Sequence, residues 1–271
     1  VGEVDWYFYA EGFNDPEEPE VLPAVRGEIT FENVWFAYND VDWVLRDVSF
    51  TIKPGQKVAF VGATGAGKSS ILNLIGRYYD IQKGSIKIDG VDIRLLSREQ
   101  IRRAIGQVQQ DVFIFTGDIA SNIRLRDEEI TDEQVKAAAV HVNANRFIDK
   151  LHGGYQERVS ERGSTFSAGQ RQLLSFARTL AYDPVILILD EATANIDTET
   201  EQWIQDALQK LMEGRTTIMV AHRLSTIQHA DKIIVLHKGK IRESGTHQEL
   251  LEMNGIYKKL YELQLAGMEE K

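Results

Sequence analysis

The sequence of 271 residues contains no cysteine. This absence excludes disulfide bonds, thiolate metal sites and cysteine catalysis, and it is typical of a reducing compartment. A basic excess is also missing: 41 acidic residues outnumber 31 basic ones, and the formal net charge of −10 at pH 7 argues against a general nucleic-acid binder. No apolar run approaches the roughly 18 residues that a membrane-spanning helix needs, and no signal-peptide pattern opens the chain. We therefore expect a chain that is soluble or peripheral to a membrane.

The first 26 residues differ in composition from the rest. Residues 15–20 read Asp-Pro-Glu-Glu-Pro-Glu, an acidic, proline-bearing stretch that indicates a linker. Ahead of it lies an aromatic cluster at residues 6–9, whose role stays open. We predict a linker or N-terminal extension over residues 1–26 and one folded domain over residues 27–271.

Hydrophobic periodicity predicts an α/β domain. Alternating apolar residues between 29 and 52 favour half-buried antiparallel strands, and residues of about 111–168 show a mostly helical pattern. Within it, Thr131 and Gln134 have capping-box spacing. Continuous apolar strands at 185–189, 217–220 and 233–236 then alternate with helical segments, which predicts a parallel sheet covered on both faces. The expected fold is α/β, with a mostly parallel sheet, an antiparallel β subdomain and a helical subdomain.

A glycine-rich loop at residues 62–69, Gly-Ala-Thr-Gly-Ala-Gly-Lys-Ser, organises the chain. It follows an apolar strand at 57–61 and opens a helical pattern, which distinguishes it from a chance glycine-rich turn. Its N–H groups and the helix N-terminus can surround phosphates, so we expect a P-loop NTPase core that binds a nucleoside triphosphate. Lys68 would reach the β- and γ-phosphates, and Ser69 would ligate Mg²⁺. The predicted nucleotide contacts in this loop are Gly62, Ala63, Thr64, Gly65, Ala66, Gly67, Lys68, Ser69 and Ser70.

Two carboxylates end the apolar strand at 185–189. In a parallel sheet, ligands bind at the carboxyl ends of the strands, where Asp190 and Glu191 stand. We expect Asp190 to hold Mg²⁺ and Glu191 to orient and deprotonate the attacking water. An acidic pair at a strand end can also serve only as a helix cap, and the phosphate loop upstream favours the functional interpretation.

With these motifs in place, residues 28–265 resemble the ATP-binding cassette ATPases. The resemblance rests further on residues 166–172, Phe-Ser-Ala-Gly-Gln-Arg-Gln, which match the family signature, and on four other motifs. It implies that Tyr38 stacks on adenine and that Gln110, rather than the adjacent Gln109, contacts Mg²⁺ and the water. It also implies that His222 donates to the γ-phosphate and that Asp197 belongs to the D-loop.

The resemblance also implies that two nucleotide-binding domains act as a dimer. Ser167, Gly169 and Gln170 of one chain would offer a helix N-terminus to the γ-phosphate held by the other chain. The usual signature reads Leu-Ser-Gly-Gly-Gln, and here Ala168 replaces the first glycine. We expect its Cβ to crowd the phosphate and to disfavour any positive φ needed there. For this reason we favour a heterodimer, with a homodimer as the alternative.

Two segments narrow the resemblance to exporters: residues 159–163, Val-Ser-Glu-Arg-Gly, and residues 241–251. In such proteins a transmembrane domain precedes the ATPase domain, which works at the cytoplasmic face of the cell membrane. The resemblance therefore implies an ATPase that powers export of drugs or lipids. Two alternatives stay open: a regulatory ABC subunit that binds ATP and hydrolyses it weakly, and a soluble ABC ATPase without a transport role.

Overall fold

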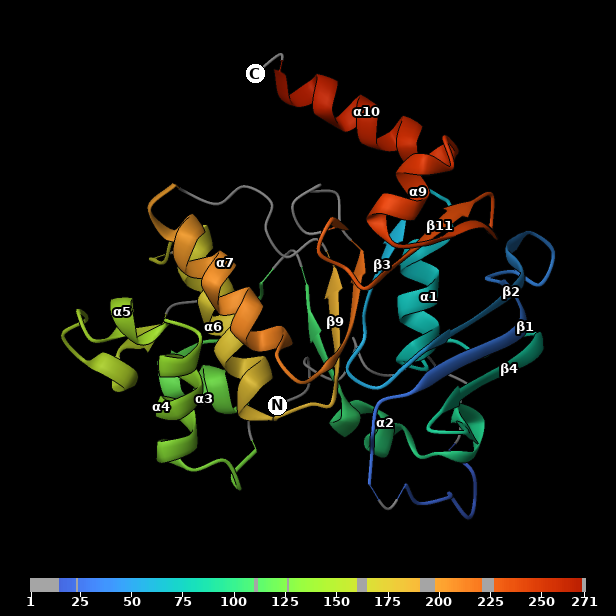
Figure 1. Cartoon of the computed structure of the whole chain (residues 1–271). Helices are drawn as coiled ribbons and strands as arrows, with labels where there is room; N and C mark the ends of the chain where they lie inside the picture. Colours follow the sequence, from blue (N-terminus) through green and yellow to red (C-terminus); the bar gives the residue numbers. More distant parts are fainter. Residues whose placement is uncertain are drawn as a thin grey trace. The chain divides into compact units, whose positions relative to one another are not determined.

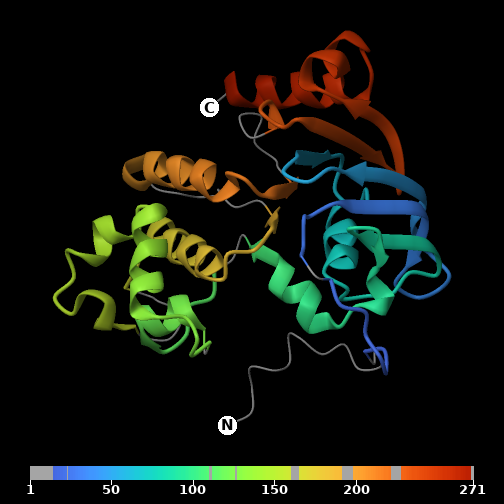
Figure 2. The same cartoon turned by 60° about the horizontal axis from the view of Figure 1, so that its bottom comes forward.

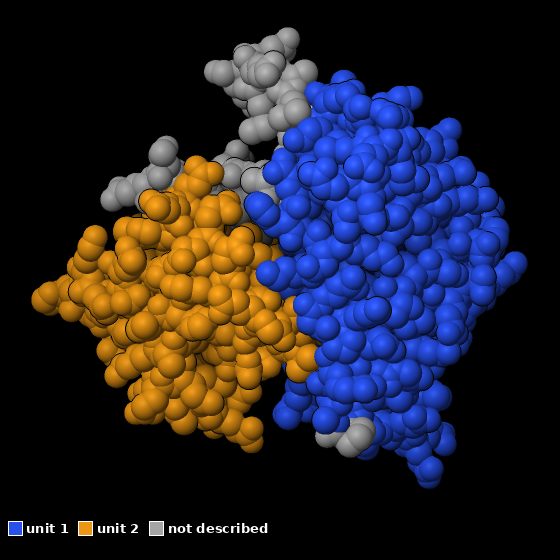
Figure 3. Space-filling view, in the orientation of Figure 1, with its two compact units in different colours: residues 1–105, 216–271 blue, residues 106–215 orange. Residues whose placement is uncertain are grey.

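The computed structural model describes residues 15–22, 24–109, 112–125, 127–159, 165–190, 198–220 and 227–269, without the side chains of residues 198, 199 and 264–269. The chain divides into two compact units (Figure 3). Unit 1 consists of Val1–Ile105 with Thr216–Lys271, and unit 2 consists of Gly106–Arg215. No helix within the described ranges combines the length and the apolar character needed to cross a membrane.

Unit 1 contains an antiparallel sheet with the strand order β2-β1-β4-β5. Strand β1 pairs with β2 on one side and with β4 on the other, and apolar side chains alternate inward along it. Phe31 of β1 stacks on Phe50 of β2 with 4.5 Å between ring centroids. The predicted antiparallel strands are confirmed, and their bounds are β1 Ile29–Ala37, β2 Trp43–Ile52, β4 Lys83–Ile88 and β5 Val91–Asp92.

A second group of strands in unit 1 is mostly parallel. Strand β3 (Lys57–Val61) lies between β10 (Thr216–Val220) and β11 (Lys232–His237), and both run parallel to it. An antiparallel strand, β12 (Lys240–Gly245), pairs with β11. Val220 pairs with Phe60 and Val235 with Val61, so the three parallel strands end at the same edge. This arrangement confirms the predicted parallel core.

The last two helices of unit 1 begin at identifiable hydrogen-bonded caps. Thr246 caps α9 through a capping box with Glu249, and the Glu243 carboxylate of β12 accepts hydrogen bonds from the N–H groups of Ile256 and Tyr257 at 2.5 and 2.9 Å. Glu243 thereby ties the start of α10, the last helix in Figure 1, to the sheet. The helical bounds are α1 Lys68–Ile75, η2 Ile93–Leu95, α2 Arg98–Ala104, α9 His247–Glu252 and α10 Ile256–Glu269.

Unit 2 is largely helical. Figures 1 and 2 show α3 and α4 beside α6 in this unit. Thr131 and Gln134 form the predicted capping box at the start of α4. The predicted helical segment of about 111–168 falls in this unit, which continues to Arg215. The bounds are β6 Ile105–Val108 (whose first residue is in unit 1), β7 Gly117–Asp118, α3 Ile119–Arg124, α4 Asp132–His141, α5 Asn145–Ile148, η3 Gly154–Gln156, β8 Arg158–Val159, α6 Ala168–Ala181, β9 Ile186–Asp190 and α7 Thr198–Met212.

The second half of the predicted linker is docked on unit 1. The N–H of Glu20 donates to the carbonyl of Leu95 at 2.8 Å. The side chain of Gln100 on α2 accepts from the N–H of Leu22 at 3.2 Å and donates to the carbonyl of Glu20 at 2.9 Å. Residues 15–22 therefore lie along η2 and α2, a placement that depends on partners about 80 residues away in the chain.

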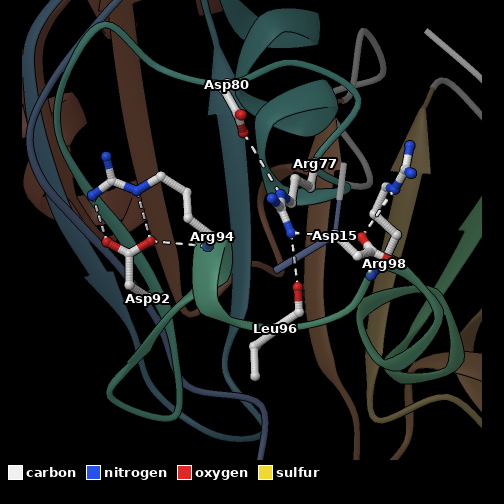
Figure 4. Close-up of polar contacts among 7 residues, drawn as sticks. All are labelled: Asp15, Arg77, Asp80, Asp92, Arg94, Leu96 and Arg98. Atoms are coloured by element: carbon white, nitrogen blue, oxygen red, sulfur yellow. Dashed lines mark hydrogen bonds and ion pairs between the residues drawn. The ribbon is translucent and has the colours of Figure 1, made fainter. Parts of the chain in front are cut away.

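An ion-pair cluster holds the start of this docked segment (Figure 4). One oxygen of Asp15 lies 3.1 Å from Nε of Arg98 and 3.9 Å from Nη1 of Arg77. Arg77 follows α1, is only 7% exposed, and donates to the carbonyl of Leu96 at 2.7 Å. Arg77 also lies 3.6 Å from Asp80, so Asp15 is one of two carboxylates that offset the cost of this buried guanidinium.

We predict that Gln100→Ala loosens the docked segment. The variant loses two hydrogen bonds worth about 0.5–1.5 kcal/mol each, so amide exchange across residues 15–22 should become about tenfold faster. Hydrogen–deuterium exchange of that peptide measures the effect. Glu99→Ala on the same helix turn is the control, and equal acceleration in both variants would contradict the role given to Gln100.

Candidate functional site

The phosphate loop depends on a left-handed residue at its end. Gly67 precedes α1 with φ of 105°, and a Cβ at this position would come within 2.6 Å of Cδ2 of Leu45. The positive φ therefore favours glycine, and an added Cβ would also force the Leu45 side chain to shift. Gly67, the residue at the N-cap of α1, has no side chain with which to cap the helix. A helix N-terminus that begins in this way is suited to bind an anion, here at the carboxyl edge of β3.

The residues predicted to contact the phosphates are consecutive and form this loop and the start of α1. Lys68 is 7% exposed, and its Nζ donates to the carbonyls of Gly62 and Ala63 at 2.6 and 3.1 Å. The ammonium group therefore lies against the loop backbone, beside the N-terminus of α1. Ser69 is exposed and Ser70 is buried. Thr64, Gly65 and Ala66 complete the turn, in which the N–H of Ala66 donates to the carbonyl of Ala63 at 3.1 Å.

A hairpin turn that the sequence reasoning missed supports the loop. Lys238 and Gly239 connect β11 to β12, and both have positive φ, 50° and 73°. The N–H of Gly239 donates to the carbonyl of Ala66 at 3.2 Å, and its carbonyl accepts from the N–H of Arg46 at 2.8 Å. Gly239 thus bridges the phosphate loop and β2. The Lys-Gly pair between two strands was the available signal.

Tyr38 lies directly after β1, and its side chain is 52% exposed. Its hydroxyl is 3.0 Å from Oγ of Ser70, so the tyrosine is connected to the phosphate-loop helix. An exposed ring beside this helix has the geometry to stack on a base.

The signature segment forms the start of α6 in unit 2. The hydroxyl of Ser167 accepts from the N–H of Gln170 at 3.2 Å, and the side chain of Gln170 accepts from the N–H of Ser167 at 3.0 Å. The predicted cap is confirmed as a reciprocal capping box. Gly169 is buried within the first turn.

Contrary to expectation, the position of Ala168 does not need a positive φ. Ala168 is the first residue of α6 and has helical backbone geometry rather than positive φ. Alanine is the strongest helix former, so it is compatible with this position. The other part of the expectation, that the Cβ of Ala168 crowds a bound phosphate, stays a prediction.

Arg178 connects α6 to the segment that follows residue 110. Its guanidinium donates to the carbonyls of Asn122 and Phe113 at 2.9 and 3.1 Å. Burial lowers the pKa of Arg178 to about 10, so the side chain remains charged at neutral pH. Asn122, which is 2% exposed, bonds both the N–H and the carbonyl of Phe115. Sequence reasoning assigned no role to either residue.

The acidic strand is present in unit 2 as β9, and Asp190 is its last residue. The predicted residues Gln110, Glu191, Asp197 and His222 lie outside the described residues. Within unit 1, β10 ends at Val220, two residues before His222, and the pairing of Val220 with Phe60 brings this end beside the strand that enters the phosphate loop. In the described parts of the chain, no cluster of three or more His, Cys, Asp or Glu residues could hold a metal. The predicted Mg²⁺ ligands Ser69, Gln110 and Asp190 would be no such cluster, because Mg²⁺ commonly takes few protein ligands and completes its shell with phosphates and water.

The parallel strands, the glycine-rich loop and the uncapped helix define a P-loop nucleotide-binding domain. The family described as "ABC transporter" matches residues 45–194, and the chain belongs to this family. It is therefore an ATP-binding ATPase domain.

Relatives and a solved structure agree with this assignment. The chain is 54% identical over 238 residues to the "Probable multidrug resistance ABC transporter ATP-binding/permease protein YheH" of Bacillus subtilis, covering 88% of this chain and 35% of that protein. It is 47% identical over 243 residues to the "ATP-dependent lipid A-core flippase" of Legionella pneumophila, covering 90% and 41%. A solved structure titled "Structure of a bacterial Atm1-family ABC exporter with ATP bound" matches with a TM-score of 0.86 and 40% identity, over 95% of this chain and 45% of that chain. The chain thus spans less than half the length of each of these three proteins. The match to the solved structure confirms the predicted fold class.

We predict that Gly239→Ala destabilises the protein more than Gly55→Ala. Both glycines have positive φ, which costs alanine about 1–2 kcal/mol. Only at Gly239 would the Cβ come within 2.1 Å of a backbone oxygen, that of Val44, which adds about 1–3 kcal/mol. Urea unfolding measures the difference. Equal losses in the two variants would mean that the hairpin turn can move away from β2.

Proposed function

We propose that this chain is the ATP-hydrolysing nucleotide-binding domain of an ABC exporter and that it powers transport of drugs or lipids. The observation that carries the proposal is the uncapped N-terminus of α1 beside Lys68, because it can bind a triphosphate at the edge where β3 and β10 end. The names of the two relatives support drugs and lipids as the transported classes.

The chemistry assigns a role to each predicted residue. Tyr38 stacks on adenine, and the backbone of residues 62–67 surrounds the phosphates. Lys68 neutralises the β- and γ-phosphates, and Glu191 orients and deprotonates the water. His222 donates to the γ-phosphate as charge develops there.

The remaining roles concern the metal and the second subunit. Ser69, Asp190 and Gln110 would hold Mg²⁺, which when bound neutralises charge on the phosphates. Ser167, Gly169 and Gln170 face the nucleotide of a second ABC domain, and Asp197 contributes the D-loop. Dimerisation then couples hydrolysis to a transmembrane domain at the cytoplasmic face of the cell membrane.

A second candidate is a regulatory ABC subunit that binds ATP but hydrolyses it weakly. Ala168 is the observation that favours it, because the extra Cβ stands at the N-terminus of the helix that would face phosphate. In a heterodimer both candidate functions would hold, one at each nucleotide site. The site with this chain's phosphate loop would hydrolyse ATP, and the site that contains Ala168 would hydrolyse it weakly.

We predict that Glu191→Gln lowers ATP hydrolysis by about 10²–10⁴-fold while ATP binding survives, because the amide cannot accept the proton of water. Phosphate release and calorimetric titration with ATP and Mg²⁺ measure the two effects, and size-exclusion reports any ATP-stabilised dimer. Glu201→Gln, on α7, is the matched control. An unchanged hydrolysis rate in Glu191→Gln would remove this residue from the role of base.

We predict that the chain alone hydrolyses ATP slowly and without cooperativity. Ala168→Gly should raise the hydrolysis rate, because it removes the Cβ that would crowd the phosphate. The rate of hydrolysis is measured as a function of ATP concentration and of protein concentration. Ala137→Gly, at an exposed position in α4, controls for the lower helix propensity of glycine. A normal cooperative rate for the unaltered chain would favour the homodimer.

A further inference from the structure

The ring of Tyr38 is held by other side chains in unit 1. The Tyr38 ring contacts Phe36 and Tyr79 edge to face, with centroids 4.7 and 5.0 Å apart and interplanar angles of 77° and 87°. The hydroxyl of Tyr38 is fixed by Ser70 at 3.0 Å. These three contacts define the plane of a ring that is still 52% exposed.

The backbone beneath this ring is held by one side-chain amide, that of Gln82. Oε1 of Gln82 accepts from the N–H of Ala37 at 3.0 Å, and Nε2 donates to the carbonyl of Ala37 at 2.9 Å. The amide thus pairs with the last residue of β1 as a neighbouring strand would. Nε2 also donates to the carboxylate of Asp40 at 2.7 Å, inside the turn that Tyr38 begins.

The turn itself needs such support because its conformation is uncommon. Asp40 has φ of 59°, and the side chain of Asn39 closes the turn by accepting from the N–H of Asp42 at 2.9 Å. Asn39 and Asp40 stabilise the turn locally. Gln82 connects the turn to the antiparallel sheet, because it directly precedes β4 and its own N–H donates to the carbonyl of Trp35 in β1 at 3.2 Å.

We infer that Gln82, assisted by Tyr79, is a positioning residue for nucleotide binding that holds Tyr38 in place for the base. The inference rests on the proposed role of Tyr38. A platform fixed in advance binds a base without a cost for ordering the turn, whereas a loose turn loses part of the stacking energy. Residues 79–82, which lie between α1 and β4, therefore support the base end of the site, and the contact of Tyr38 with Ser70 connects that end to the phosphate-loop helix.

Gln82→Glu tests the inference with little change in size. The carboxylate can still accept from Ala37, but it loses both donated bonds and lies against Asp40 with like charge. Calorimetry measures the Kd for ATP and for tripolyphosphate, each with Mg²⁺; tripolyphosphate has no base. We expect an about tenfold weaker Kd for ATP and an unchanged Kd for tripolyphosphate.

A double variant separates positioning from general damage. In a Tyr38→Ala background, Gln82→Glu should cause no further loss of ATP affinity, because its effect passes through the Tyr38 ring. Tyr79→Leu should weaken ATP binding in the same selective way, and Tyr79→Phe, which keeps the ring, should not. Gln56→Glu is the matched control: the Gln56 side chain likewise accepts from a backbone N–H, that of Lys53 at 3.1 Å, in a different turn.

Three results would overturn the inference. Equal weakening of ATP and tripolyphosphate would show that Gln82 supports the fold in general. An unchanged ATP affinity in Gln82→Glu, with Tyr38→Ala impaired, would show that Tyr38 does not need Gln82, whatever the effect of Tyr79→Leu. If Tyr38→Ala itself bound ATP normally, the base-stacking role would fail, and the inference that rests on it would fail with it.

Discussion

The left-handed turn at Gly67 is the constraint on which unit 1 depends. It directs the chain from β3 into α1 and leaves the first N–H groups of the helix without a side-chain cap. Leu45 of β2 fills the space that a Cβ would take, and Gly239 bonds the loop at Ala66. Strands that are distant in the sequence therefore hold one short loop in place. A rigid backbone lets the N–H groups of the helix end bind an anion without first being reorganised.

The two helices with predicted phosphate contacts begin differently. Helix α1 follows a glycine without a cap, whereas α6 begins with the reciprocal capping box of Ser167 and Gln170. The capping box uses one N–H of the first turn of α6. Ala168 suits this helical start, so the replacement of glycine affects space near a phosphate rather than backbone conformation. Arg178 and Asn122 then connect α6 to the segment after residue 110.

The base end of the site, like the phosphate loop, is held in place by residues from elsewhere in unit 1. Tyr38 is exposed, yet Tyr79 and Ser70 restrict its ring, and Gln82 restricts the adjoining backbone at Ala37. Ser70 belongs to α1, Tyr79 lies between α1 and β4, and Gln82 directly precedes β4. The phosphate-loop helix and the antiparallel sheet therefore both support the base end of the site.

The sequence by itself determined the features that short-range physics encodes. The phosphate loop, the strand alternation and the capping boxes at Thr131 and Ser167 each depend on residues within a few positions, or on a regular period, so they could be predicted. The tertiary structure alone decided that Gln82 pairs with Ala37, that Gly239 supports Ala66 and that residues 15–22 dock on Gln100. The last of these partners lie about 80 residues apart, and no local pattern specifies which distant side chain a backbone N–H will meet. The roles of Gln110, Glu191, Asp197 and His222 remain predictions from motif order. The physical reason for the division is that local hydrogen bonds and periodicity are written in neighbouring residues, whereas these contacts exist only after the chain has folded.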